Sequence, residues 1–120
     1  MKIYIAGPIT GMPNHNEQEF KSVENELRAL GHEPVNPFTI ADKLNTSYGE
    51  IQKSFDVLYK CGKDAPGSEL AKKTIEMDMD ELSTCDVIYL LPGWRKSRGS
   101  LEELRQAKKL GLDVVDSESI

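Results

Sequence analysis

The sequence predicts a three-layer α/β fold around a parallel sheet of four or five strands. Short apolar runs alternate with segments of helical periodicity along the chain. The two most apolar runs, residues 3–6 and 87–91, each stop at an adjacent glycine and proline. Strands that alternate with helices pair in parallel through right-handed crossovers, and their helices cover both faces of the sheet. A chain of 120 residues has room for one such domain, over residues 1–120, and none for a second.

The first elements are a strand over residues 3–6 and a helix that follows it. Asn14 and Glu17 have the spacing of a capping box at the helix start, and Gly31 has the usual place after a helix end. The apolar stripe of this helix consists of Phe20, Val23, Leu27 and Leu30. Residues 32–36 form a weak strand, whose proline places it at or near a sheet edge.

Residues 37–67 are the least regular part of the sequence. One helix is predicted near residues 48–60, and residues 62–67 are predicted to form a loop. A segment of this length without a clear strand, placed after a strand end, indicates a lid or the wall of a pocket.

The remaining residues return to the alternation of helix and strand. Ser68 is predicted to cap a helix, and residues 87–91 form the most apolar strand. The inner stripe of that helix is Ala71, Ile75, Met79 and Leu82. A last helix begins at Ser100 and ends before Gly111, and residues 114–115 form a final short strand. This order of elements is typical of a flavodoxin-like, Rossmann-like sheet.

Two loops leave the carboxyl ends of predicted strands, over residues 7–13 and 92–99. Open α/β sheets bind ligands at such ends. The second loop leads directly into a helix start, whose N–H groups and partial positive charge favour an anion. The alternative is an ordinary loop in which Arg95, Lys96 and Arg98 are solvated. Spacing alone slightly favours this alternative.

Two acidic residues point toward apolar helix faces. Glu103 projects to the same flank as Ala107, whereas Glu102 projects to the opposite side. Asp78 projects to the edge of the buried stripe of its helix, where an unpaired carboxylate is costly. Each acid also has a structural interpretation: Glu103 could close a capping box with Ser100, and Asp78 could accept a hydrogen bond from a loop amide. The residues alone leave these alternatives open.

The cysteines and histidines of the sequence do not indicate a metal site or redox chemistry. Cys61 and Cys85 cannot form a disulfide framework or a four-ligand zinc site, and we interpret them as reduced thiols of a cytoplasmic protein. His15 and His32 have no neighbours at metal-ligand spacing, so no metal site is expected. Trp94 lies in a strand-end loop, where it could stack on a base or pack against the lid.

Charge and hydropathy argue against two classes of partner. A net charge of -5 argues against a nucleic-acid polymer, although backbone amides and hydroxyls can still hold a small anion. No apolar stretch approaches the roughly 20 residues that span a bilayer. The first residues lack the features of a signal peptide. We therefore expect neither a nucleic-acid nor a membrane partner.

Three short motifs resemble those of the nucleoside 2-deoxyribosyltransferase-like family, which includes deoxyribosyltransferases and 2′-deoxynucleoside 5′-monophosphate N-glycosidases. The first is Tyr-Ile-Ala-Gly-Pro-Ile-Thr-Gly over residues 4–11. The second is Asp78, eight residues before an Asp-Val-Ile sequence, and the third is Ser-Arg-Gly-Ser-Leu-Glu-Glu over residues 97–103. Leu-Pro-Gly-Trp over residues 91–94 is similar to a small uncharacterised bacterial and phage branch of the family. The resemblance covers most of residues 2–115, but residues 37–67 do not align.

The resemblance implies a role for each matching residue. Glu103 would be the nucleophile that attacks C1′ of a 2′-deoxyribosyl unit, and Asp78 would assist the departing base. Ser97 stands where the transferases have an aspartate for the sugar 5′-hydroxyl, and a serine there resembles the monophosphate N-glycosidases. The other expected substrate-binding residues are Tyr4, Gly7, Pro8, Ile9, Thr10, Gly11, Trp94, Gly99 and Ser100.

The implied mechanism resembles retaining glycoside hydrolysis, with a covalent deoxyribosyl-enzyme and no metal or other cofactor. Its two carboxyls should lie roughly 5 to 8 Å apart. We place Glu103 in the first helical turn, where the helix dipole favours its ionised form, and expect Asp78 to keep its proton on a more apolar face.

Substrate and assembly follow from the same resemblance. We expect a preference for 5′-monophosphates, because Ser97 removes a negative charge and Arg95, Lys96 and Arg98 add positive charge nearby. Residues 113–120 contain no asparagine of the kind that transferases use from a neighbouring subunit, which argues against full transferase activity. Relatives assemble through helices around the active site, so a homodimer or larger assembly is expected.

Two other kinds of function compete with this enzyme. The chain could be a non-catalytic nucleotide-binding module that keeps the same pocket. It could also be a structural domain in which Glu103 is a cap and Asp78 packs in the interior. Release of free base from deoxynucleosides or their 5′-monophosphates would separate the enzyme from both.

Overall fold

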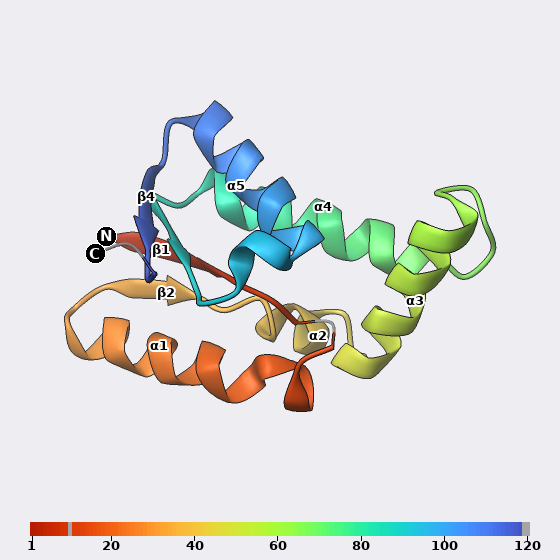
Figure 1. Cartoon of the computed structure of the whole chain (residues 1–120), viewed down its shortest axis with the longest axis horizontal. Coiled ribbons are helices and arrows are strands. Elements are labelled where there is room, and N and C mark those ends of the chain that lie inside the picture. The colour runs from red at the N-terminus through yellow and green to blue at the C-terminus, as the bar shows by residue number, and fades with distance from the viewer. Residues whose placement is uncertain (10, 119–120) are drawn as a thin grey trace.

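The computed structural model describes residues 1–9 and 11–118, in which a four-stranded sheet lies between helices (Figure 1). Its strands are β1 (Lys2–Ala6), β2 (Glu33–Val35), β3 (Val87–Leu90) and β4 (Asp113–Asp116). The α-helices are α1 (Glu17–Ala29), α2 (Thr39–Lys43), α3 (Tyr48–Cys61), α4 (Glu69–Ser83) and α5 (Arg98–Leu110). Two short 3₁₀ helices, η1 (Pro13–Asn16) and η2 (Trp94–Lys96), precede α1 and α5. No helix in these ranges is both long and apolar enough to cross a membrane.

All four strands run parallel in the order β2-β1-β3-β4, which confirms the predicted flavodoxin-like α/β fold. β2 lies at one edge of the sheet, where Pro34 pairs with Ile3. Proline has no backbone N–H to donate, which an edge strand tolerates because it has no neighbour on its outer side. The chain leaves β1 for β2 on one side and returns to β3 on the other. This change of direction creates the switch point at which open parallel sheets bind ligands.

The alternation of side chains along β1 separates two cores. The core on the α1 side contains Ile3, Ile5, Phe20, Val23 and Leu27. The core on the opposite side contains Tyr4, Ala6, Leu82, Leu104 and Ala107. Because successive strand residues point to opposite faces, β1 presents Tyr4 to the layer that carries α4 and α5.

The segment over residues 37–67 contains α2 and α3, and α3 lies beyond the end of the sheet beside α4 (Figure 1). Ser54 links the two helices, because its hydroxyl donates to the carbonyl of Gly67 and accepts from the amide of Ala71. The short helix α2 was absent from the sequence prediction, since its five residues are too few to show a helical period.

The predicted start of α1 is wrong. Asn14 has a left-handed backbone conformation within η1, and the residue that precedes the helix is Asn16. Asn16 does not cap the helix with its side chain but donates to the carbonyl of Pro8, which ties η1 to the loop after β1. Leu30, predicted in the apolar stripe, is 69% exposed because the helix ends one residue before it.

The start of α4 is placed as predicted, but Ser68 does not cap the helix with its hydroxyl. It donates instead to the carbonyls of Lys63 and Ala65 in the preceding loop. Ile75, predicted in the inner stripe, is 36% exposed and lines a pocket described below.

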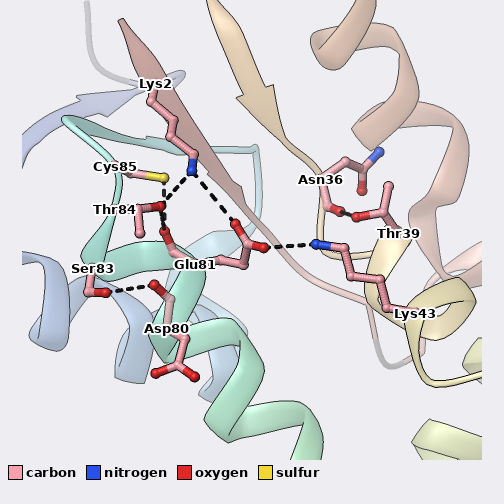
Figure 2. A network of polar contacts seen from close by, with 9 residues as sticks. All are labelled: Lys2, Asn36, Thr39, Lys43, Asp80, Glu81, Ser83, Thr84 and Cys85. Carbon is pink, nitrogen blue, oxygen red and sulfur yellow. Dashed lines mark hydrogen bonds and ion pairs between the residues drawn. The ribbon is translucent and has the colours of Figure 1, made fainter.

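A polar network fixes the other end of α4 (Figure 2). Glu81 lies between two lysines, with 2.8 Å to Lys43 Nζ from α2 and 3.9 Å to Lys2 Nζ from β1. Lys2 Nζ also donates to Thr84 Oγ1 over 2.6 Å. The hydrogen bond from Lys43 lowers the pKa of Glu81, so its charge is kept at neutral pH. The network joins β1, α2 and the last turn of α4, and so helps to position Asp78 one turn earlier.

Candidate active site

A pocket of about 750 Å³ opens beside the loops that leave β1 and β3. Its walls come from the loop after β1, one side of α3, the middle of α4 and the start of α5. This volume is in the range of small-molecule sites, roughly 300–1,000 Å³. The pocket therefore lies where the strand order predicts a ligand.

Asp78 of α4 and Glu103 of α5 both line this pocket. The buried Tyr4 of β1 donates its hydroxyl hydrogen to Glu103 Oε2. In addition to burial, the negative charge of Glu103 raises the pKa of Asp78, so the two carboxyls interact electrostatically within the pocket. The structure thus brings together the two acids that the sequence singled out.

One oxygen of Asp78 has no partner in the described part of the chain. Oδ1 is buried and takes part in no hydrogen bond there. Buried carboxyl oxygens are normally hydrogen-bonded, because burial without a partner costs roughly 1–3 kcal/mol. An unpaired oxygen in a ligand-sized pocket is therefore free to serve a ligand.

The surroundings of both carboxyls favour the protonated form. Burial raises the pKa of Glu103 to about 7, against the hydrogen bond from Tyr4, which lowers it. Burial, and next the negative charge of Glu103, raise the pKa of Asp78 well above its ordinary value. Each of the two acids therefore holds a proton more tightly than an exposed carboxyl does.

Glu103 does not lie in the first turn of α5, because the helix begins at Arg98 and has no acid in its first turn. The dipole argument for an ionised Glu103 is therefore wrong, and its state is set by burial and by Tyr4. The capping-box interpretation also fails. The capping residue is Ser97, whose Oγ accepts from the amide of Ser100 over 3.2 Å and from the Ser100 hydroxyl over 3.0 Å.

The structure separates Trp94 and Arg95 from the pocket. Trp94 lies in the core, and its Nε1 donates to Asp116 Oδ1. It is not among the pocket walls formed by the described residues, and its contact with substrate stays a prediction. Arg95 pairs with Asp116 and Glu118 at 3.0 and 2.6 Å, and is therefore not the free cation that the sequence predicted.

The loop after β1 contributes Gly7, Pro8 and Ile9 to the pocket. A Cβ on Gly7 would lie 2.7 Å from Leu91 Cβ, so only glycine fits between the ends of β1 and β3. Gly11 is exposed and lies outside the described walls. Thr10, also predicted to bind substrate, lies outside the described residues. At the start of α5, Ser97, Gly99 and Ser100 line the pocket.

The sequence prediction missed the side chains that α3 supplies. The pocket-lining residues of this helix are Tyr48, Gln52, Phe55, Asp56 and Tyr59. At about 100° per residue these five positions fall within an arc of roughly 100°, which is one face of the helix. That spacing is visible in the sequence. Without the fold, however, the sequence does not show whether this helix face lines a pocket or packs in the core.

The described ranges contain no cluster of three or more His, Cys, Asp or Glu side chains that could hold a metal ion. The pocket offers hydroxyls, carboxyls and cations suited to an organic ligand.

Residues 1–116 match the model of a family described as a domain of unknown function, DUF4406. The chain belongs to the DUF4406 family. The match includes every element of the fold and both pocket acids. No curated protein matches this DUF4406 chain.

Among solved structures, the chain is similar in fold to a 2-desoxiribosyltransferase from Leishmania mexicana. The two chains share a TM-score of 0.55 and 19% sequence identity. The alignment covers 96% of this chain but 62% of the other, so the DUF4406 protein spans less than two thirds of that structure. The fold predicted from the sequence motifs, that of a nucleoside 2-deoxyribosyltransferase, is therefore confirmed.

Proposed function

We propose that this protein cleaves the N-glycosidic bond of 2′-deoxynucleosides or their 5′-monophosphates, by hydrolysis or by transfer of the sugar to another base. One observation carries this proposal: Asp78 and Glu103 line the same ligand-sized pocket, where Tyr4 donates to Glu103 and Asp78 has an unpaired oxygen. Two carboxyls beside one sugar site, roughly 5–5.5 Å apart, are typical of retaining glycosidases.

The two acids would divide the reaction. A carboxylate oxygen of Glu103 attacks C1′ and forms a C1′–O bond while the C1′–N bond breaks. Asp78 gives its proton to a ring atom of the base, which leaves neutral. Water then attacks C1′, the bond to Glu103 breaks, and the Asp78 carboxylate takes the proton of that water. In a transfer reaction the nitrogen of a second base replaces the water.

The surroundings of the two acids support this division. Burial raises the pKa of Glu103 to about 7, so Glu103 is ionised above that pH and acts as the nucleophile. At Asp78 burial and the charge of Glu103 together raise the pKa well above its ordinary value, which favours the proton that the base needs.

The chemistry of the pocket walls supports a nucleotide as substrate. Phe20 and Tyr48 line the pocket, and the ring centroid of Phe38 lies 5.2 and 4.5 Å from theirs. Lys96 and Arg98 also line it, beside the start of α5. A base offers flat faces to aromatic rings, and a phosphate offers oxygens to cations. The name of the Leishmania mexicana protein is consistent with this substrate class.

The proposal is tested by incubating the protein with the four common 2′-deoxynucleosides and their 5′-monophosphates and measuring free base. Glu103→Gln and Asp78→Asn should each lower the rate at least about a hundredfold, because general-acid or nucleophilic groups contribute that much or more. Asp80→Asn is the matched control, since Asp80 lies on the exposed side of the same helix as Asp78.

A covalent intermediate distinguishes this mechanism from direct attack by water. Mass spectrometry of protein quenched during turnover should find one deoxyribosyl unit on the peptide that contains Glu103. If no base is released from any substrate while a nucleotide still binds, the protein is a nucleotide-binding module and the catalytic proposal fails.

A further inference from the structure

Two arginines near the start of α5, Arg95 and Arg98, each lie over an aromatic ring but differ in their ion pairs. The guanidinium carbon of Arg95 lies 4.5 Å from the ring centroid of Trp94, and that of Arg98 lies 4.2 Å from the ring centroid of Tyr59. Arg95 is neutralised by Asp116 and Glu118. Arg98 has no ion pair with a carboxylate in the described residues, and both Arg98 and Tyr59 line the pocket.

The stack on Tyr59 leaves Arg98 able to bind an anion. The aromatic ring covers one flat face of the guanidinium, whereas the N–H groups point outward in its plane. Those groups can form two parallel hydrogen bonds to a phosphate, and the ring does not cancel the positive charge as a carboxylate would. The stack also restrains a long side chain, so less rotamer freedom is lost when an anion binds.

The start of α5 is less available to an anion than its sequence indicated. The amide of Ser100 already donates to Ser97 Oγ, and the amide of Leu101 donates to the carbonyl of Ser97. Ser97 therefore serves the helix as its cap. Lys96 and Arg98 are the basic side chains that line the pocket beside this helix start, and they can discriminate between a phosphate and a hydroxyl.

We propose that Arg98, held on the ring of Tyr59, binds the 5′-phosphate of the substrate and makes the site prefer a nucleotide to a nucleoside. Tyr59 is the positioning residue: it comes from α3, across the pocket from α5, and sets the direction in which the guanidinium points. This inference rests on the proposed function for its substrate class. It assigns the phosphate preference to one of the three cations over residues 95–98 and to Tyr59, which lies outside the family motifs.

The test compares kcat/KM for each 5′-monophosphate with that for the matching deoxynucleoside. Arg98→Gln should lower the ratio about ten- to hundredfold, the range expected from hydrogen bonds to a charged group. Arg98→Lys should give an intermediate ratio. Arg95→Gln is the matched control and should leave both substrates unchanged. The proposal is overturned if Arg98→Gln leaves the ratio as it was, or if Arg95→Gln lowers it equally.

Variants of Tyr59 test its positioning role. Tyr59→Leu removes the ring and should raise KM for monophosphates several-fold more than it changes kcat. Tyr59→Phe keeps the ring and should restore the wild-type ratio. Equal effects of the two variants would show that the hydroxyl matters and would contradict stacking as the cause.

Failure of the proposed function can be told apart from failure of this inference. If the wild-type protein releases no base, calorimetry with the same four nucleotide and nucleoside pairs replaces the rates. Tighter binding of the nucleotides that is lost at least tenfold in Arg98→Gln supports the inference without any catalysis. Equal affinity of the wild-type protein for nucleotide and nucleoside overturns it.

Discussion

Tyr4 on β1 donates its hydroxyl hydrogen to the carboxyl of Glu103 on α5, across 99 residues of sequence. The ring of Tyr4 is fully buried in the core beneath α4 and α5, so the hydroxyl is held at a fixed point of the sheet. Asp78 lines the same pocket, and burial together with the charge of Glu103 raises its pKa. The position of Glu103 thus depends on an interior strand of the sheet.

Removal of the Tyr4 hydroxyl should impair the pair while the core stays packed. The hydrogen bond from Tyr4 lowers the pKa of Glu103, so Tyr4→Phe should raise that pKa further above 7 and leave less ionised nucleophile at neutral pH. We expect kcat/KM at pH 7 to fall about ten- to hundredfold, in line with one hydrogen bond to a charged group. The pH profile is the decisive measurement: its acid limb should move to higher pH. A uniform loss at every pH would contradict this explanation.

The wild-type rate should depend on pH with a bell-shaped profile. Below about pH 7 Glu103 is protonated and cannot attack, so the acid limb should fall near that value. Above the raised pKa of Asp78 the base receives no proton, which gives the alkaline limb. Asp78→Asn should abolish the alkaline limb and keep the acid limb. Because the two acids interact, the limbs report the pair. A flat profile between pH 5 and 9 would contradict the assignment.

The convergence of the two acids could be predicted because short-range patterns determine it. The alternation of strand and helix along the chain and the glycine-terminated strands predict the sheet, and helical projection predicts that Asp78 and Glu103 face inward. Tyr4 belongs to the motif over residues 4–11, but its hydrogen bond to Glu103 could not be predicted, because it requires the sheet and α5 to be assembled.

Other features depend on contacts that no local pattern encodes. Ser97 rather than Ser100 caps α5, because η2 turns the chain so that the Ser97 hydroxyl meets the helix start. The charge of Arg95 is neutralised by Asp116 and Glu118. Because these acids lie over 20 residues away in sequence, no local pattern shows the pairing. Arg98 meets Tyr59 only because α3 packs beside α4. Such long-range pairings are not visible in helical or strand periodicity.

Gly7 should be required for stability as well as for the pocket. An added Cβ would lie 2.7 and 2.8 Å from Leu91 Cβ and Cδ1, and Leu91 is fully buried. Gly7→Ala should therefore lower the free energy of unfolding by about 1–3 kcal/mol, the usual cost of overpacking. Urea denaturation measures this change. Gly49→Ala is the matched control: it lies in α3 with 3.8 Å to the nearest atom and should be neutral or stabilising. Equal stability of the two variants would contradict the close approach of β1 and β3.

The burial of Glu103 should make the protein less stable as pH rises, independently of any activity. Its pKa is 4.5 in an ordinary environment and about 7 in the folded chain, so between these values the folded state binds more protons than the unfolded state. The free energy of unfolding therefore falls as pH rises from about 4.5 to 7, and the full penalty is present above pH 7. Glu103→Gln keeps the shape without the charge and should be more stable than the wild type at pH 8, by about 1–3 kcal/mol. At pH 4.5 the difference should vanish, because the wild-type carboxyl is then protonated. Urea denaturation at the two pH values measures both results, with the exposed Asp80→Asn as the control that changes neither. A Gln variant that is no more stable than the wild type at pH 8 would show that the pocket solvates Glu103 fully, and the raised pKa that supports its role would then be wrong.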